Sequence, residues 1–214
     1  MDDSAAPPGS QKNQIAALEA ENGLRQYDET IEAIRYYLEP ERPFALRPGL
    51  IQQLQAVAVR GMVAAPGRWR TTKVKIWERR HKPPEPHLVG PLIQELCDYV
   101  NGNFHERTPL HLSAYVMWRL NWVHPFEDGN GRTSRAVSYL VLCTGMRLLL
   151  PGSPTIPQQI QADRTEYFDA LEKADEALEA GAIDVSAMEE ALKNMLAKQL
   201  LGVIAQAGGS IPGP

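Results

Sequence analysis

The sequence predicts an all-α domain: a helical bundle around one central buried helix, with a single small β-hairpin. Apolar residues recur at helical spacing through most of the 214 residues. The stretch from Thr133 to Met146 is apolar on almost every side, which is typical of a helix at the centre of a bundle. Residues 64–86 break the helical pattern, and the alternation of Val74 and Ile76 with lysines indicates a hairpin there.

Each helix is delimited by its apolar spacing and by proline or glycine near its ends. The first helix is expected over residues 11–38, and Gly23 could divide it in two. Its apolar stripe consists of Ile15, Leu18, Leu24, Tyr27, Ile31, Ile34 and Leu38. The later helices are expected at 48–61, 88–100, 109–123, 133–146, 157–180 and 184–205. Prolines and lysines around the hairpin predict an edge element.

Four segments are expected along the chain. Residues 1–10 are rich in Pro, Ser and Ala and should be disordered. Residues 11–44 form an N-terminal helical segment, and residues 45–205 form the main domain with its C-terminal helices. Residues 206–214 are rich in Gly and Pro and are expected to be a flexible tail.

The composition is that of a globular protein that acts away from membranes and nucleic acids. The net charge is −4 with both signs interspersed, which argues against a nucleic-acid binder. No apolar run reaches membrane-spanning length, and the first residues lack the features of a secretory signal. We therefore expect a cytoplasmic protein, with export by a specialised secretion system left open. Cys97 and Cys143 lie in apolar stretches and are expected to be buried free thiols.

Residues 124–135, with the sequence HPFEDGNGRTSR, concentrate the polar groups that chemistry needs. Pro125 disfavours helical geometry at His124, so the preceding helix should end there. The run DGNG at 128–131 favours a turn and leads directly into the buried helix. A glycine-rich loop before a helix is an anion site, because unpaired N–H groups and the helix dipole both point at the ligand.

The side chains around this loop suit phosphate chemistry. Arg132 and Arg135 share a helix face, and two guanidinium groups suit a phosphate chain better than a single carboxylate. Asp128 offers a hard oxygen ligand for Mg²⁺, and His124 can take a proton near pH 7. A base, a metal ligand, an anion cradle and two phosphate clamps together predict phosphoryl or nucleotidyl transfer.

Each of these residues also has a purely structural interpretation. Asp128 or Asn130 could cap the helix, the arginines could be solvated surface charges, and a lone histidine is more often structural than catalytic. Phe126 is expected in the core under either interpretation. The functional interpretation is favoured because these residue types occur together in one loop–helix context.

This segment resembles the signature of the Fic family, His-Pro-Phe-x-Asp/Glu-Gly-Asn-Gly-Arg-x-x-Arg, at every specified position. The likeness extends over about residues 45–180, since a helix at 109–123 precedes the loop and residues 67–84 look like the family's β-hairpin flap. The resemblance implies the Fic fold and a protein adenylyltransferase. Such an enzyme moves AMP from ATP to a Ser, Thr or Tyr hydroxyl of a target protein, including its own chain, and releases pyrophosphate.

Carried over to this chain, the resemblance implies a role for each charged residue of the loop. His124 would deprotonate the target hydroxyl, and Asp128 would hold Mg²⁺ against the α- and β-phosphates. Arg132 would neutralise charge on the transferring phosphates, and Arg135 would meet the γ-phosphate.

The resemblance also implies an anion cradle and a docking element for the target. Backbone amides of Gly129, Asn130 and Gly131 would form the cradle, with the Asn130 side chain assisting. The flap at about 73–82 would pin the target protein by adding it as a strand. A related branch that phosphorylates its targets carries Lys in place of Gly131, so Gly131 favours transfer of AMP.

Many Fic proteins are held inactive by a glutamate in a Ser/Thr-x-x-x-Glu-Gly/Asn helix, which pairs with the last arginine of the signature. Glu21-Asn22 matches the last two positions of that pattern, with Ala17 at the first, so Glu21 is predicted to be inhibitory. Glu19 and Glu190 are the alternatives, and a solvated helix charge is the structural interpretation of all three.

Two other functions stay open. An enzyme of the same fold could remove AMP from a modified protein, with the inhibitory glutamate positioning water. A catalytically idle module could instead serve protein interaction or toxin–antitoxin regulation. The resemblance is compatible with a homodimer, because Fic proteins often form dimers.

Overall fold

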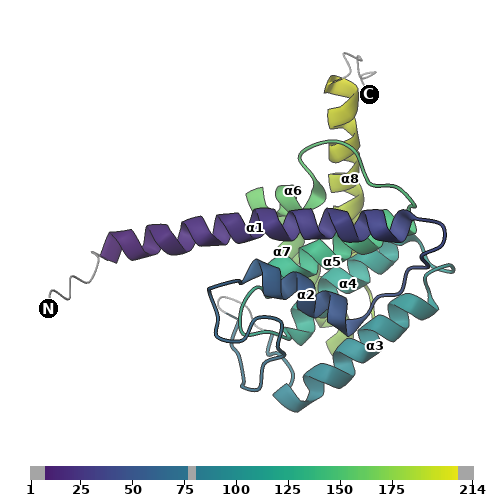
Figure 1. Ribbon diagram of the computed structural model, residues 1–214. Coiled ribbons are helices and arrows are strands. Elements are labelled where there is room, and N and C mark those ends of the chain that lie inside the picture. The colour runs from purple at the N-terminus through teal and green to yellow at the C-terminus, as the bar shows by residue number, and fades with distance from the viewer. Residues whose placement is uncertain (1–7, 77–80, 207–214) are drawn as a thin grey trace, which may run out of the picture.

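The computed structural model describes residues 8–76 and 81–206, and all the regular structure within them is helical (Figure 1). The elements are α1 (Pro8–Leu38), α2 (Pro48–Ala58), the 3₁₀ turn η1 (Pro86–Leu88), α3 (Val89–Gly102), α4 (Pro109–Val123), α5 (Asn130–Gly145), α6 (Ile156–Ala162), α7 (Thr165–Glu179) and α8 (Ser186–Gln206). The all-α prediction is therefore confirmed. The expected disordered start and flexible tail fall mostly outside the described residues, although α1 already begins at Pro8.

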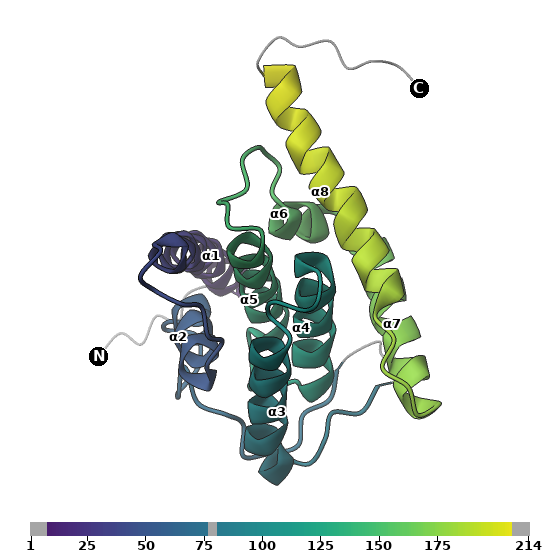
Figure 2. The same cartoon turned by 90° about the vertical axis from the view of Figure 1, so that its right-hand side faces the viewer.

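Helix α5 lies at the centre of the bundle, as its all-round apolar sequence predicted. Thirteen of its sixteen residues are buried. It lies beside α4, with α1 and α2 on one side and α7 and α8 on the other (Figure 2). The hydroxyls of Ser113 on α4 and Ser138 on α5 are 2.7 Å apart, and small side chains at this crossing let the two helices approach closely. The residues at the start of α5 are thus carried by a helix that is buried along most of its length.

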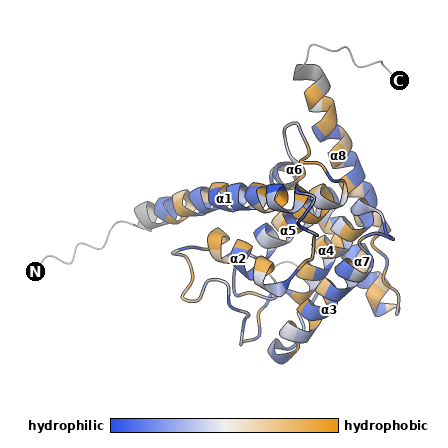
Figure 3. Ribbon diagram, turned by 45° about the vertical axis from the view of Figure 1, so that its right-hand side comes forward, coloured by the Kyte–Doolittle hydropathy of each residue, from blue (hydrophilic) through white to orange (hydrophobic). Residues whose placement is uncertain are grey.

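Helix α1 runs unbroken through Gly23 and packs on the bundle through a polar stripe. Asn22, Gln26 and Thr30 are almost fully buried on it. The Asn22 amide donates to the Arg60 carbonyl at 2.8 Å, and these bonds offset the cost of burying polar groups. The expected apolar stripe holds toward the C-terminal end of α1, where Ile34 is fully buried and Ile31 and Leu38 pack against the core, but it fails at Leu24, which is 69% exposed. Figure 3 accordingly shows α1 as mostly hydrophilic with short hydrophobic bands, and Figure 1 shows its N-terminal part projecting from the bundle.

The helix expected at 157–180 is in fact two helices, α6 and α7. The chain breaks at Asp163, whose carboxylate accepts a hydrogen bond from the Thr165 amide at 2.9 Å and so caps the start of α7. The remaining helices begin and end within a few residues of their predicted ends. Cys97 and Cys143 are buried free thiols, as expected. None of the helices in the described part of the chain is long and apolar enough to span a membrane.

The β-hairpin expected within 73–82 is not seen among the described residues. Residues 71–76 and 81–85 are irregular, and residues 77–80 lie outside the described part. Two physical reasons account for the difference. Pro83 and Pro84 have no N–H to donate to a ladder. The Thr72 and Pro84 carbonyls, one on each limb, both accept hydrogen bonds from the Arg70 side chain and not from backbone N–H groups of a ladder.

Candidate active site

Two residues with positive φ mark the ends of the loop between α4 and α5. His124 caps α4 in the left-handed conformation, with φ 49° and ψ 60°. Gly129 caps α5 with φ 80°. A Cβ at Gly129 would lie 2.7 Å from Cγ1 of Val59, so only glycine fits without movement. The predicted end of α4 at His124 is therefore confirmed, and α5 begins three residues earlier than expected, at Asn130.

The Asn130 side chain holds the loop in shape. Its amide accepts from the Phe126 N–H and donates to the Phe126 carbonyl, both at 2.9 Å. Phe126 is fully buried and packs against Trp69, with ring centroids 4.8 Å apart. The bond to the Phe126 carbonyl uses one of the two N–H donors of the Asn130 Nδ2, so the predicted help of this side chain in binding phosphate stays a prediction. Its backbone N–H, in the first turn of α5, has no intrahelical acceptor and stays suited to an anion.

Asp128 and Arg132 lie together at the outer end of the loop. The Asp128 carboxylate accepts from the Gly129 amide at 2.6 Å and from Arg132 at 3.2 Å, and its side chain is 50% exposed. Arg132 also donates to the Ala58 carbonyl at the end of α2, at 2.8 Å. The described residues contain no group of three or more side chains that could hold a metal. A single half-exposed carboxylate fits Mg²⁺, which commonly takes one or two protein ligands and completes its shell with phosphates and water.

Arg135 is a buried cation without a described acceptor. It is 8% exposed, and no hydrogen bond or ion pair described for the chain ends on its guanidinium. Burial lowers the pKa of Arg135, with Tyr167 raising it and the positive charges of Arg164 and Arg132 lowering it further. Charged groups are seldom buried without compensation. The site therefore suits an anion that binds against Arg135.

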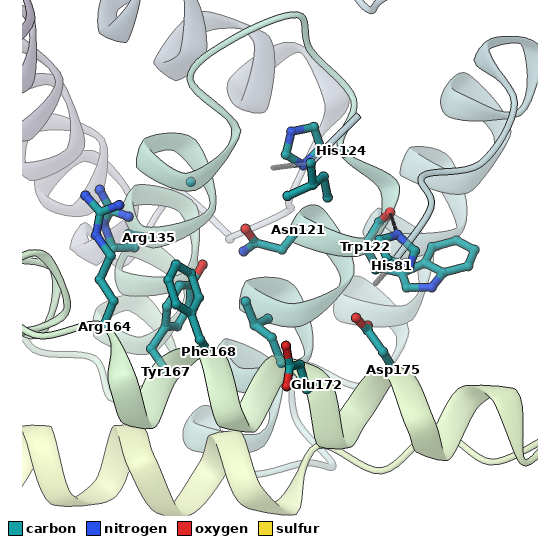
Figure 4. A pocket seen from close by; sticks show the side chains of 13 residues that line it. His81, Asn121, Trp122, His124, Arg135, Arg164, Tyr167, Phe168, Glu172 and Asp175 are labelled. Carbon is teal, nitrogen blue, oxygen red and sulfur yellow. Dashed lines mark hydrogen bonds between the residues drawn. The ribbon is translucent and has the colours of Figure 1, made fainter. Parts of the chain in front are cut away.

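The cavity beside Arg135 has a volume of about 400 Å³ and receives residues from α4, α5, α7 and both limbs of the 71–85 segment. Its lining residues are Ile76, His81, Asn121, Trp122, His124, Gly131, Arg135, Arg164, Tyr167, Phe168, Leu171, Glu172 and Asp175. Figure 4 shows Arg135 and Arg164 beside the rings of Tyr167 and Phe168, with Glu172 and Asp175 farther along α7. One end of the cavity is thus cationic, its middle is lined by aromatic rings, and its other end is acidic. A cationic end suits the phosphates of a nucleotide, and an aromatic lining suits a base.

Residues 45–142 match the model of the Fic/DOC family. These residues form a Fic/DOC-family domain. The chain is also 30% identical over 109 residues to "Protein adenylyltransferase Fic" of Nematostella vectensis, an alignment that covers 50% of this chain and 23% of the relative. The chain therefore spans less than a quarter of that relative's length.

Solved structures share the fold of the whole bundle. A Fic family protein from Desulfovibrio desulfuricans G20 superposes with a TM-score of 0.67 at 20% identity, over 91% of this chain and 55% of the other. A Fic domain containing signaling protein from Bacteroides thetaiotaomicron gives 0.69 at 18% identity, over 91% of this chain and 74% of the other. The Fic fold thus extends on both sides of the matched domain, over α1 and over the helices after α5.

The wall that α7 gives to the Fic domain's cavity was missed by sequence analysis. Its residues recur at 164, 167, 168, 171, 172 and 175, which is the spacing of one helix face. That face carries one arginine, two aromatic rings and two acids, a mixture that reads as an ordinary amphipathic surface. Its functional meaning appears only when tertiary packing sets it opposite the loop of the Fic domain.

Of the three candidate inhibitory glutamates, the structure brings Glu19 to the Fic loop. The Glu19 carboxylate lies 3.5 Å from Arg132. Glu21 instead forms a 2.6 Å ion pair with Arg25 on the same helix and is 56% exposed. Glu190 pairs with Lys193 on α8. Two residues along a helix correspond to a turn of about 200°, so Glu21 and Glu19 face different sides of α1. None of the contacts described for the three glutamates reaches Arg135, the last arginine of the signature, so the inhibitory role of Glu21 stays a prediction.

Proposed function

We propose that the chain is a Mg-ATP-dependent protein adenylyltransferase. The observation that carries the proposal is one cavity lined both by His124 and by the buried guanidinium of Arg135, with the first turn of α5 between them. A proton acceptor and an anion site that line the same cavity suit attack of a hydroxyl on a phosphate ester. The name of the Nematostella relative, a protein adenylyltransferase, supports the same reaction.

Each bond formed in the proposed reaction is matched by a bond broken, and the residues of the loop and of α5 receive the proton and the phosphate charge. The target hydroxyl oxygen attacks the α-phosphorus of ATP, the bond from that phosphorus to the bridging oxygen of the β-phosphate breaks, and pyrophosphate leaves. His124 takes the hydroxyl proton. First-turn amides of α5 stabilise charge on the α-phosphate, and Arg135 binds the terminal phosphate. Mg²⁺ held by Asp128 would supply further charge neutralisation on the phosphates.

Gly131 supports transfer of AMP over transfer of the terminal phosphate. A Cβ at Gly131 would lie 3.4 Å from Nη1 of Arg135, so a long side chain there would enter the space in front of the arginine. With glycine, that space is open to the terminal phosphate, and the α-phosphate lies beside the catalytic histidine.

The target protein is proposed to dock along the segment 73–82. Ile76 and His81, the described residues next to the gap, both line the cavity. A target strand added along this segment would therefore lie beside the cavity that His124 also lines.

Glu19 is proposed as the residue that restrains the site. It pairs with Arg132, and the same guanidinium contacts Asp128, the proposed ligand for Mg²⁺. Glu19 is 53% exposed, so this ion pair is worth about 1 kcal/mol or less. The expected consequence of Glu19→Gly is a severalfold gain in AMP transfer, including transfer to hydroxyls of the chain itself.

Intact-mass spectrometry after incubation with Mg-ATP tests the function. Addition of AMP to the Glu19→Gly protein or to an added target, and its absence in the Glu19→Gly/His124→Ala double variant, is the expected result. Labelling that survives loss of His124 contradicts the mechanism. Release of free AMP from an AMPylated target would indicate the reverse reaction, and failure to bind ATP with Mg²⁺ present would indicate an idle module.

A further inference from the structure

Arg70 is a buried charge that lies outside the proposed nucleotide site and contacts the catalytic loop. It is 2% exposed, and its guanidinium donates to four carbonyl oxygens. The acceptors are His124 at 2.7 Å, Thr72 at 3.1 Å, Pro84 at 2.6 Å and Val123 at 3.3 Å. Arg70 is absent from the lining of the nucleotide cavity. A fully buried arginine that bonds to four backbone carbonyls is suited to holding those parts of the backbone in place.

All four acceptors of Arg70 are neutral. Burial lowers the pKa of Arg70, and Glu85 partly opposes that shift. Two of the carbonyls, those of Val123 and His124, belong to the end of α4, where the last carbonyls of a helix lack intrahelical donors and carry the negative end of the dipole. Arg70 therefore caps α4 at the turn where that helix delivers the catalytic histidine.

Arg70 holds the backbone on both sides of the His124–Pro125 bond. Its Nε bonds to the His124 carbonyl, and its own N–H donates to the Pro125 carbonyl at 2.8 Å. His124 has φ 49°, a conformation that costs a non-glycine residue about 1–2 kcal/mol and persists when the surroundings over-determine it. Two consecutive carbonyls fixed by one residue supply that determination and set the direction of the His124 side chain.

The same guanidinium joins the two limbs of the flap segment. Thr72 precedes the proposed docking segment and Pro84 follows it, and both bond to Arg70. Arg70 also bonds to the carbonyl of His124, the residue that would take the proton of the target hydroxyl. One side chain therefore contacts both the base of the proposed docking segment and the proposed proton acceptor.

We propose that Arg70 is a positioning residue, which keeps His124 and the base of the target-binding segment in one register. This inference rests on the proposed adenylyltransferase function. It predicts that loss of the guanidinium lowers kcat while leaving the affinity for nucleotide intact, because the phosphate-binding groups belong to α5 and α7.

The test compares Arg70→Met with a matched control, Gln199→Met. Gln199 is also fully buried and takes part in four hydrogen bonds, with Tyr139, Leu150, Pro151 and Ile156, far along the chain from the loop. Below the Tm of both variants, kcat for AMP transfer should fall about 100-fold in Arg70→Met, the scale of a 1 Å misplacement. It should change less than about threefold in Gln199→Met, and the Kd for Mg-ATP should stay within about twofold in both.

Arg70→Lys separates charge from geometry. Lysine keeps the charge and the stem but cannot donate in four fixed directions, so it should restore Tm more than kcat. If the two methionine variants lose kcat equally, or if Arg70→Met weakens Mg-ATP binding as much as it lowers kcat, Arg70 is structural and the proposal is overturned.

A measurement without turnover keeps this inference separate from the proposed function. The imidazole signals of His124 in the NMR spectrum of histidine-labelled protein should shift in Arg70→Lys, and those of His111 should not. Unchanged His124 signals overturn the positioning role whether or not the protein transfers AMP. An inactive wild-type protein with a shifted His124 signal overturns the proposed function alone.

Discussion

Replacement of Gly129 by alanine should destabilise the fold and distort the loop that it caps. The left-handed backbone at φ 80° costs an alanine about 1–2 kcal/mol. The new Cβ would lie 2.7 Å from Cγ1 of Val59, and relief of such an overlap costs about 1–3 kcal/mol. The alanine variant has a lower conformational entropy in the unfolded state, which offsets about 0.4–1 kcal/mol of this loss of stability. The expected net loss is about 1–5 kcal/mol of unfolding free energy.

The matched control is the same substitution at Gly23. This glycine lies within α1, and a Cβ there meets nothing within 4 Å. Gly23→Ala should therefore stabilise the protein by about 0.5–1 kcal/mol through helix propensity. Urea unfolding followed by tryptophan fluorescence measures both, with unchanged m-values as the condition for comparison. If the two variants shift the midpoint in the same direction, the strain assigned to Gly129 is wrong.

Three further results are expected. Arg135→Ala should weaken Mg-ATP binding about 10- to 100-fold by calorimetry, which is the scale of one charged hydrogen bond. It should weaken ADP binding much less. Equal losses of affinity for both nucleotides would contradict the contact between Arg135 and the terminal phosphate. Asn130→Ala should lower the unfolding free energy by about 2–4 kcal/mol in urea, since it leaves the Phe126 N–H and carbonyl unsatisfied; a change under about 1 kcal/mol would contradict this. Burial raises the pKa of Cys97 to about 12 and that of Cys143 to about 11, so neither thiol of the folded protein should react with a disulfide reagent at pH 8. The free energy of unfolding should also fall as pH rises above about 9, because the thiols then ionise in the unfolded chain but not in the folded protein. Rapid labelling of either thiol at pH 8 would show that it is accessible.

Helix positions and the loop could be predicted because local patterns determine them. Apolar spacing with a proline at the start gave α4 its bounds, Pro109–Val123, without error. The turn sequence at 128–131 and the buried helix after it are both present. The inward face in the middle of α1 could not be obtained in this way, because the residues buried there are polar. Gln26 is 5% exposed and donates to the Leu54 carbonyl at 3.1 Å, whereas the apolar Leu24 faces outward.

The same polar face explains why Glu19, and not Glu21, lies beside Arg132. Positions 19, 22 and 26 follow one helix face at spacings of three and four, so the buried Asn22 and Gln26 bring Glu19 toward the bundle. A motif match identifies positions in a sequence, but the side of a helix that meets its neighbours depends on which groups find partners there. In α1, tertiary hydrogen bonds such as that from Asn22 to the Arg60 carbonyl determine which side of the helix faces the bundle.

The shape of the 124–128 loop depends on a second segment that no signature residue predicts. The Gln55 side chain donates to the Asp128 carbonyl at 2.9 Å and accepts from the Gly67 amide at 2.6 Å. Trp69 packs on Phe126, and Arg70 bonds to the carbonyl of His124, so residues 67–70 follow the loop from one end to the other.

In the proposed reaction the signature supplies the reacting groups, and the segment from α2 to Arg70 supplies the contacts that hold them in place. A loop with left-handed residues at both ends would sample other conformations if it were held only by its own Asn130. It follows that transplanting residues 124–135 into another helical bundle should not transfer activity unless the segment from Gln55 to Arg70 goes with them. The family match from 45 to 142 contains both parts, which is the physical reason to regard that span as one functional unit.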